Sequence, residues 1–231
     1  VMWSMAVYRE DRYDRPLHVA ADSVNIPQIK KLLADCNNPN EIDFYYRTPL
    51  HYAASQGSVE AISLLLKSGA MTDVQDFSEM YPLSLAIYGN HVEAVKLLVK
   101  SGAKINYAGF KKLTALHMSL EENLNPQIAL HLIQAGANVN AREEGGNTPL
   151  HYAVGIKRIE IVKAMIKAGA DLETENGEQN TALMIAVARD DLHTLLHELL
   201  RVGEVPGTPH VLGVGGGRGS RRPPPLDVGG Q

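Results

Sequence analysis

Residues 48–51 read Thr48-Pro49-Leu50-His51, and this phrase or a close variant of it occurs six times along the 231-residue chain. The leucine of each copy follows the previous one after 33 or 34 residues. The six leucines are Leu17, Leu50, Leu83, Leu116, Leu150 and Leu183. Self-similarity at such a fixed period indicates an array of stacked units, each of which buries its apolar face only against its neighbours.

One copy of the pattern predicts two short helices. Thr48 is a residue type that caps a helix start, and Pro49 suits the first helical turn. Apolar side chains at 59–66 then recur at the spacing of a second helix, after a turn at Gly57. Gly69 is expected to end this helix in the left-handed conformation, which glycine tolerates best.

The phrase and its period resemble those of the ankyrin-repeat family, across residues 15–203. The resemblance implies an all-α solenoid of stacked helix-turn-helix units joined by β-turn fingers. A lead-in at 1–14 is expected to pack on the first repeat. The six repeats are expected at about 15–46, 47–79, 80–112, 113–146, 147–179 and 180–203.

Three copies have features of their own. In the fourth, one extra residue within 121–126 predicts a longer turn between the helices. In the first, Cys36 stands where the other copies carry the glycine of a helix end, so we expect a local structural role for it. In the sixth, leucines between 192 and 200 form one stripe opposite a polar face, which predicts a C-terminal cap.

The last 28 residues, 204–231, have a different composition. Glycine, proline and arginine dominate this segment, which includes Pro223-Pro224-Pro225. Such composition cannot offset the entropy of ordering, so we expect a disordered tail. It is interpreted as a linker or as the product of alternative splicing, and a proline-rich ligand for an adaptor domain is the other interpretation.

Composition and charge exclude several classes of function. The formal net charge of −4 gives no basic surplus for binding nucleic acid. No run of about 18 apolar residues is present, so no membrane span is expected. The single cysteine, Cys36, suits a reducing compartment. We therefore expect a monomer inside the cell, in the cytoplasm, with the nucleus as an alternative.

Candidate catalytic and metal-binding residues have simpler structural explanations. Four of the nine histidines occupy the last position of the repeated phrase, one per repeat and therefore outside a single ligand sphere. The resemblance implies that they hydrogen-bond between adjacent repeats. His193 and His197 have the spacing of metal ligands on a helix, but no third ligand accompanies them. We expect no enzyme activity, no cofactor and no metal site.

The resemblance places a protein partner on the concave face, formed by the fingers and the first helix of each repeat. Exposed aromatic side chains are enriched in interface hot spots. Phe77, Tyr88, Tyr107 and Phe110 therefore mark the expected centre of binding. The residues expected to contact a partner are Tyr52, Gln56, Phe77, Tyr88, Tyr107, Phe110, Lys111, Met118, Arg142 and Tyr152.

The resemblance also suggests a modification. Fingers of this family often carry an asparagine that an asparaginyl hydroxylase recognises, eight residues after a leucine. Asn106 with Leu98, and Asn140 with Leu132, fit that spacing. An unmodified, turn-forming asparagine is the alternative at both positions.

Three functional hypotheses follow. The first is a non-enzymatic protein-interaction module, acting as an adaptor, inhibitor or scaffold. The second is the substrate-recruiting subunit of a ubiquitin ligase of the ankyrin and SOCS-box kind, although no SOCS-box helices follow Gly203. The third is the repeat region of a secreted toxin or bacterial effector. The identity of the partner is not encoded in any motif.

Overall fold

A computed structural model describes residues 15–188 of the chain. This part holds eleven α-helices, one 3-10 helix and no β-strand. The α-helices are α2 (Pro16–Asp22), α3 (Ile26–Ala34), α4 (Pro49–Ser55), α5 (Val59–Lys67), α6 (Pro82–Tyr88), α7 (Val92–Lys100), α8 (Ala115–Met118), α9 (Pro126–Gln134), α10 (Pro149–Gly155), α11 (Ile159–Lys167) and α12 (Ala182–Val187). The 3-10 helix, η1, is Phe110–Lys112.

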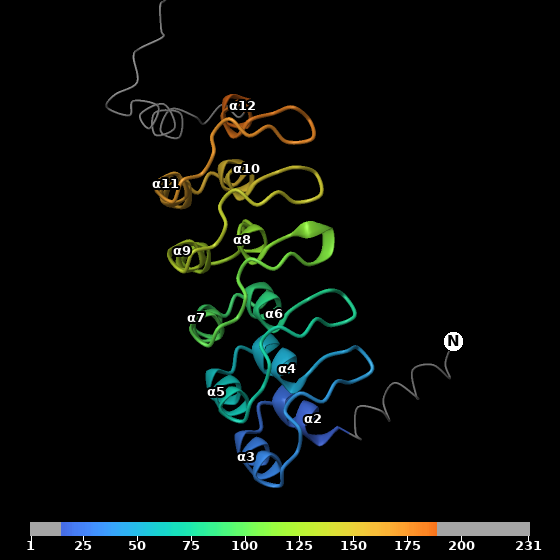
Figure 1. The fold of residues 1–231 in the computed structure, drawn as a ribbon. Coiled ribbons are helices and arrows are strands. Elements are labelled where there is room, and N and C mark those ends of the chain that lie inside the picture. Colours follow the sequence, from blue (N-terminus) through green and yellow to red (C-terminus); the bar gives the residue numbers. More distant parts are fainter. Residues whose placement is uncertain (1–14, 189–231) are drawn as a thin grey trace, which may run out of the picture.

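The helices form two layers, with a row of fingers along one side (Figure 1). The first helix of each repeat, from α2 to α12, packs on the first helix of the next one. The second helices, from α3 to α11, stack in the same order as an outer layer. The expected all-α solenoid of stacked units is confirmed for the described residues.

The core runs along the solenoid as a continuous apolar seam. The leucines of the repeated phrase are buried at Leu17, Leu50, Leu83, Leu116 and Leu150. The second helices contribute equivalent buried residues from their inner faces, namely Leu65, Leu98, Leu132 and Met165. Each repeat thus supplies one wall of the core of its neighbour, as its own apolar face requires.

The helix ends form where the sequence predicts them. Gly69, Gly102, Gly136 and Gly169 all have φ near +90°, in the region that only glycine adopts freely. Cys36 has φ +59° at the equivalent place, so it replaces a glycine with the left-handed backbone retained. This geometry places Cys36 at the helix end that the sequence predicts, and a local structural role for its side chain stays a prediction.

The fourth repeat contains the predicted longer turn. Its first helix, α8, ends at Met118, and α9 begins only at Pro126. In the second repeat, by contrast, three residues separate Ser55 from Val59. Ser119 and Leu120 are buried like their equivalents Ala53 and Ala54 of the second repeat, so the chain leaves the core only after Leu120.

Several sequence predictions lie outside the described residues. These concern the lead-in at 1–14, the leucine stripe and histidine pair of the sixth repeat, and the tail at 204–231. Between residues 15 and 188, none of the helices has both the length and the apolar character that crossing a membrane requires.

Candidate protein-interaction surface

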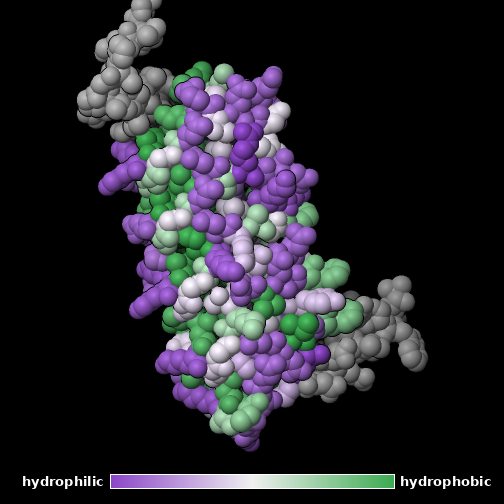
Figure 2. All heavy atoms as spheres, viewed as in Figure 1, coloured by the Kyte–Doolittle hydropathy of each residue, from purple (hydrophilic) through white to green (hydrophobic). Residues whose placement is uncertain are grey.

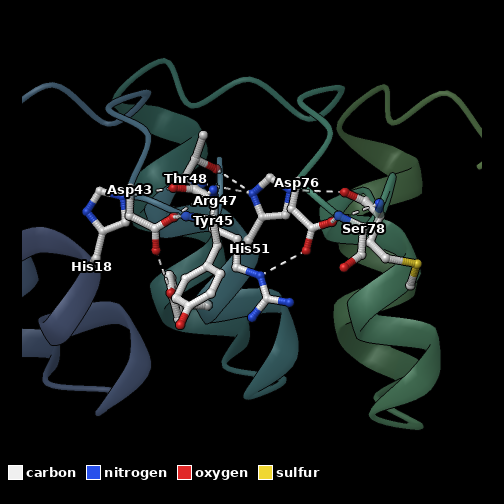
Figure 3. Close-up of polar contacts among 10 residues, drawn as sticks. His18, Asp43, Tyr45, Arg47, Thr48, His51, Asp76 and Ser78 are labelled. Atoms are coloured by element: carbon white, nitrogen blue, oxygen red, sulfur yellow. Dashed lines mark hydrogen bonds and ion pairs between the residues drawn. The ribbon is translucent and has the colours of Figure 1, made fainter. Parts of the chain in front are cut away.

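The repeated histidines link each repeat to the finger that follows it. His51 is fully buried, and its Nε2–H donates to the carbonyl of Met80 at 3.3 Å (Figure 3). Because that carbonyl can only accept, Nδ1 is the acceptor of the ring, and it receives the Thr48 backbone N–H at 3.0 Å. The Thr48 hydroxyl lies 2.9 Å from the same nitrogen. The inference that these histidines bridge adjacent repeats is confirmed.

The same bridge occurs in three further repeats. The Nε2 atoms of the other histidines face finger carbonyls at 3.0–3.2 Å. The pairs are His18 with Arg47, His117 with Asn147 and His151 with Asn180. Burial lowers the pKa of His51 to about 4, and it also lowers the pKa values of His18 and His117. The rings of His18, His51 and His117 are therefore neutral structural groups at physiological pH.

A side chain at the base of each regular finger holds its turn. The Asp43 carboxylate accepts the backbone N–H groups of Tyr45 and Arg47, at 2.8 and 2.9 Å. Asp76 accepts those of Ser78 and Met80 in the same way. Glu143 and Asn176 take the corresponding position in the last two fingers. The fingers are thus rigid turns and can present side chains at fixed positions.

Neighbouring fingers are also joined to one another. Arg47 Nε donates to Asp76 Oδ2 at 2.9 Å, and the Asp76 side chain is almost fully buried (Figure 3). The backbone N–H of Phe77 donates to the carbonyl of Tyr45 at 2.8 Å. The Asp76 carboxylate therefore both holds the turn of its own finger and pairs with Arg47 of the preceding finger.

The third finger, residues 104–114, is built differently. Gly109 replaces the acidic residue of the earlier fingers, and both Lys111 and Lys112 have positive φ, at 55° and 59°. A Cβ atom on Gly109 would lie 2.6 Å from the carbonyl oxygen of Glu79, so only glycine fits this close approach. The Tyr107 ring packs on Tyr81 at a centroid separation of 5.3 Å.

Three phenylalanines occupy the same position in three successive fingers. Phe44, Phe77 and Phe110 follow one another at intervals of 33 residues, and their exposed fractions are 58%, 78% and 58%. We call these three side chains the fingertip ridge. The next two fingers carry Glu144 and Gly177 at this position, so the ridge ends at the third finger.

The face shown in Figure 2 displays the same difference between the first three fingers and the last two. Hydrophobic atoms, in green, lie among the fingers at the right edge of the lower repeats, whereas the fingers of the upper repeats are purple. An apolar hollow of about 640 Å³ opens beside the ridge. Its lining consists of Arg15, Ile42, Asp43, Phe44, Tyr45, Tyr46 and Phe77. Exposed large aromatic residues of this density are typical of binding surfaces.

The structure corrects two of the residues expected at the partner site. Tyr52 and Met118 are buried, each with 6% of its surface exposed. The Tyr52 hydroxyl donates to Asp43 Oδ2 at 2.6 Å, and its ring packs edge-on against His18. Both expectations treated the position after the histidine as outward-facing, but there the side chain packs under the finger. Neither residue is available to a partner.

The remaining expected residues lie on the surface, with different surroundings. Phe77, Tyr88, Tyr107 and Phe110 are exposed, but Tyr88 is on helix α6 and the other three are on fingers. Tyr152 is half-buried against His117, at 5.6 Å between ring centroids. The exposed polar residues of the set are Gln56, which donates to Asp22, Arg142, which donates to the carbonyl of Glu175, and Lys111, whose ammonium lies over the Phe110 ring.

The sequence interpretation missed the first finger, which contributes most of the hollow. Phe44, Tyr45 and Tyr46 are three consecutive exposed aromatic residues. The signal was present in the sequence, because Phe44 lies one repeat before Phe77 and two before Phe110. Aligning the fingers by the leucine register would have revealed it.

The two asparagines proposed for hydroxylation take part in bridges between fingers. The Asn140 side-chain oxygen accepts the Asp171 backbone N–H at 2.8 Å, and its amide donates to the carbonyl of Gly169 at 3.0 Å. Asn106 makes the corresponding contacts with Asn138 and Gly136. Both side chains are exposed, and their hydroxylation stays a prediction.

No group of three or more His, Cys, Asp or Glu side chains within residues 15–188 is arranged to hold a metal ion. The polar clusters of this region are instead the histidine bridges and the finger latches. The arrangement therefore offers shape, aromatic surface and charge for recognition.

A family model for ankyrin repeats, described as three copies, matches residues 17–109 and again 116–205. The fold is that of a repeat scaffold for protein recognition, and the chain belongs to the ankyrin-repeat family.

Similar proteins share only segments of the chain. The chain is 33% identical over 104 residues to protein fem-1 homolog A of Danio rerio, and the match covers 38% of this chain and 17% of that protein. It is 36% identical over 85 residues to the fowlpox virus putative ankyrin repeat protein FPV219, covering 37% and 19%. With the human 2-5A-dependent ribonuclease it shares 44% over 59 residues, covering 24% and 8%. The matches span less than a fifth of each relative's length.

Proposed function

We propose that this chain is a non-enzymatic protein-interaction module, an adaptor or scaffold that binds a protein partner on its finger side. Ankyrin repeats are in general protein-protein interaction modules, which supports the class of function. The observation that carries the proposal is the fingertip ridge, because Phe77 exposes 78% of its surface on a turn held rigid by Asp76.

The centre of binding is proposed to lie on the first three fingers. There the ridge and the apolar hollow lined by Phe44 and Phe77 supply exposed aromatic surface, and Tyr107 adds another exposed ring on the third finger. The last two fingers carry no aromatic residue, and the fifth exposes Glu173, Glu175 and Glu178 instead. Aromatic side chains supply a large contact area and dominate interface energetics, whereas exposed carboxylates are depleted from interface centres.

Affinity purification of the full chain from cells that express it, followed by mass spectrometry, tests the proposal. A Phe77→Ala/Phe110→Ala variant is compared with Met71→Ala, which removes an exposed apolar residue of the second finger that lies off the ridge. We expect the double variant to lose its specific partner and to keep its melting temperature. Truncating one hot-spot residue typically weakens binding by about 2 kcal/mol or more, roughly 30-fold. Unchanged capture by the double variant would contradict this placement.

A further inference from the structure

We propose that the fingertip ridge binds a polyproline II segment of the partner protein, with a large apolar side chain at every third residue and an acidic residue at the end that reaches the third finger. This inference rests on the proposed function, since it names the class of partner that the same surface would take. It follows from the spacing, width, rigidity and charge of the ridge.

The spacing of the ridge matches the period of a polyproline II helix. Successive repeats stack helix on helix, and packed helices are separated by about 8–10 Å. Phe44 and Phe77 occupy equivalent positions in turns of the same backbone geometry, so we infer that their side chains repeat at about that interval, and Phe110 continues the series on the third finger, whose turn is built differently. A polyproline II helix has three residues per turn and rises about 3.1 Å per residue, so every third side chain returns to one face after about 9 Å.

Other extended or helical partners fit this surface less well. In a β-strand the side chains of one face recur every two residues, about 7 Å apart, and drift out of step with the ridge. An amphipathic helix presents an apolar stripe several side chains wide. On the second and third fingers the ridge is one side chain wide, because Ser78 and Glu79 follow Phe77, and Lys111 and Lys112 follow Phe110.

The hollow beside the ridge provides a recess for such a ligand. Phe44 and Tyr46 of the first finger and Phe77 of the second line it together. Grooves lined by aromatic side chains are the surfaces on which proline-rich segments dock, since such segments lose little entropy on binding. The Phe77–Tyr45 and Glu144–Lys111 backbone hydrogen bonds, at 2.8 and 2.9 Å, fix fingers that carry the ridge. The protein side therefore also needs little ordering.

The charge of the fingers gives the ligand a direction. The second finger, residues 71–80, carries three carboxylates and no lysine or arginine, whereas residues 104–113 of the third carry three lysines and no carboxylate. Lys104 is paired with Asp73. Lys111 and Lys112 are exposed, and neither forms an ion pair with a carboxylate of the described part of the chain. An acidic residue of the ligand therefore belongs beside these two ammonium groups.

A designed peptide tests the inference without knowledge of the partner. The probe is a fluorescein-labelled peptide of sequence Leu-Pro-Pro-Leu-Pro-Pro-Leu-Asp-Asp, titrated with the full chain and followed by fluorescence anisotropy. Two control peptides keep the length. One spaces the leucines by two residues, and the other ends in Ser-Ser in place of Asp-Asp. We expect saturable binding of the probe and at least tenfold weaker binding of the peptide with two-residue spacing.

Variants of the chain assign the contacts. Phe77→Ala should weaken binding of the probe about tenfold or more, and Met71→Ala should leave it unchanged. Lys111→Gln/Lys112→Gln should weaken binding of the probe several-fold but not that of the peptide ending in Ser-Ser. Equal binding of the two leucine spacings, or of wild type and Phe77→Ala, would overturn the inference.

Two further outcomes separate this inference from the proposed function. If the purified partner is lost on Phe77→Ala while no peptide binds, the surface stands and the partner class is wrong. The chain itself carries Pro224-Pro225-Leu226-Asp227, which matches the Pro-Pro-Leu-Asp end of the probe. If Pro224→Ser/Leu226→Ser in the full chain strengthens binding of the probe, that segment competes for the ridge, and the assignment to a separate partner is overturned.

Discussion

The junction between the second and third repeats differs sharply from the next one along the solenoid. At the first, the His51–Met80 hydrogen bond joins the two repeats, and the Arg47–Asp76 ion pair joins the fingers on either side of the second repeat. At the second, Ser84 replaces the histidine and makes no hydrogen bond to the following finger within residues 15–188. There Tyr81 packs on Tyr107 instead.

The comparison shows that adjacent repeats of the same helical architecture can be joined by two kinds of contact, a polar bridge or packed aromatic rings. The apolar seam is continuous through both junctions, so stacking does not depend on the polar bridge. Where the bridge is absent, the neighbouring finger also departs from the regular turn, with Gly109 in place of an acidic residue. The finger at the irregular junction also carries the exposed Lys111 and Lys112.

Replacing His51 should reveal the difference between the two junctions most clearly. His51→Ala removes a fully buried ring with bonds to Thr48 and Met80, so we expect it to lower the free energy of unfolding by about 3 kcal/mol. Ser84→Ala, at the equivalent position, should cost less than about 1 kcal/mol. Urea unfolding followed by circular dichroism measures both. Equal costs would show that the bridge contributes nothing beyond packing.

Acidification should weaken the histidine-bridged junctions selectively. Above pH 6.5 the His51 ring is neutral in both folded and unfolded chains. Between pH 6.5 and about 4 the unfolded chain takes up a proton that the buried ring resists, so stability falls as pH falls. At pH 5 the loss from His51 alone is about 2 kcal/mol, and the lowered pKa values of His18 and His117 add to it.

The pH dependence has an internal control. Urea unfolding is measured at pH 7.5 and pH 5 for wild type and for His51→Gln. The variant should lose less stability over that interval, because position 51 no longer titrates. Parallel pH profiles for the two proteins would mean that His51 is not the group responsible.

The close approach of the second and third fingers provides a smaller perturbation. Gly109→Ala places a Cβ atom 2.6 Å from the carbonyl oxygen of Glu79, and we expect a loss of about 1–2 kcal/mol from the forced separation. Gly155→Ala, where nothing lies within 4 Å of the added atom, should be neutral or slightly stabilising. Thermal melting compares them, and a neutral Gly109→Ala would show that the fingers separate freely.

Much of the fold could be predicted from the sequence because it follows from a repeated register. The leucine period located the helices, the finger turns and the helix-end glycines, and the extra residues near 121–126 located the longer turn. The same turn and helix-capping residues recur in each copy, so the structure predicted for one copy applies to the others. The bridging role of His51 came from the resemblance to the family, and the structure supplies its geometry.

The candidate site was less predictable, because it depends on which way particular side chains face. Tyr52 and Tyr88 are both tyrosines on first helices, yet Tyr52 is buried and Tyr88 is exposed. Tyr52 lies one residue after His51 and reaches Asp43 under the finger, whereas Tyr88 ends helix α6. Over a helix of only seven residues, the helical period defines only approximately which side chains face the core. The orientation of such positions therefore had to come from the structure.

The smallest predicted effect concerns the one helix end that lacks a glycine where its equivalents have one. Cys36 holds φ +59°, which costs a side-chain-bearing residue of the order of 1 kcal/mol relative to glycine. Cys36→Gly should therefore raise the free energy of unfolding by about 0.5–1 kcal/mol, even though it increases the freedom of the unfolded chain. Asp35→Gly, one residue earlier at φ −79°, is the matched control. It should lower the free energy of unfolding, because there glycine only increases the conformational entropy of the unfolded chain. If both substitutions destabilise to the same extent, contacts of the Cys36 side chain outweigh its backbone strain, and the first repeat is not equivalent to the others at this turn.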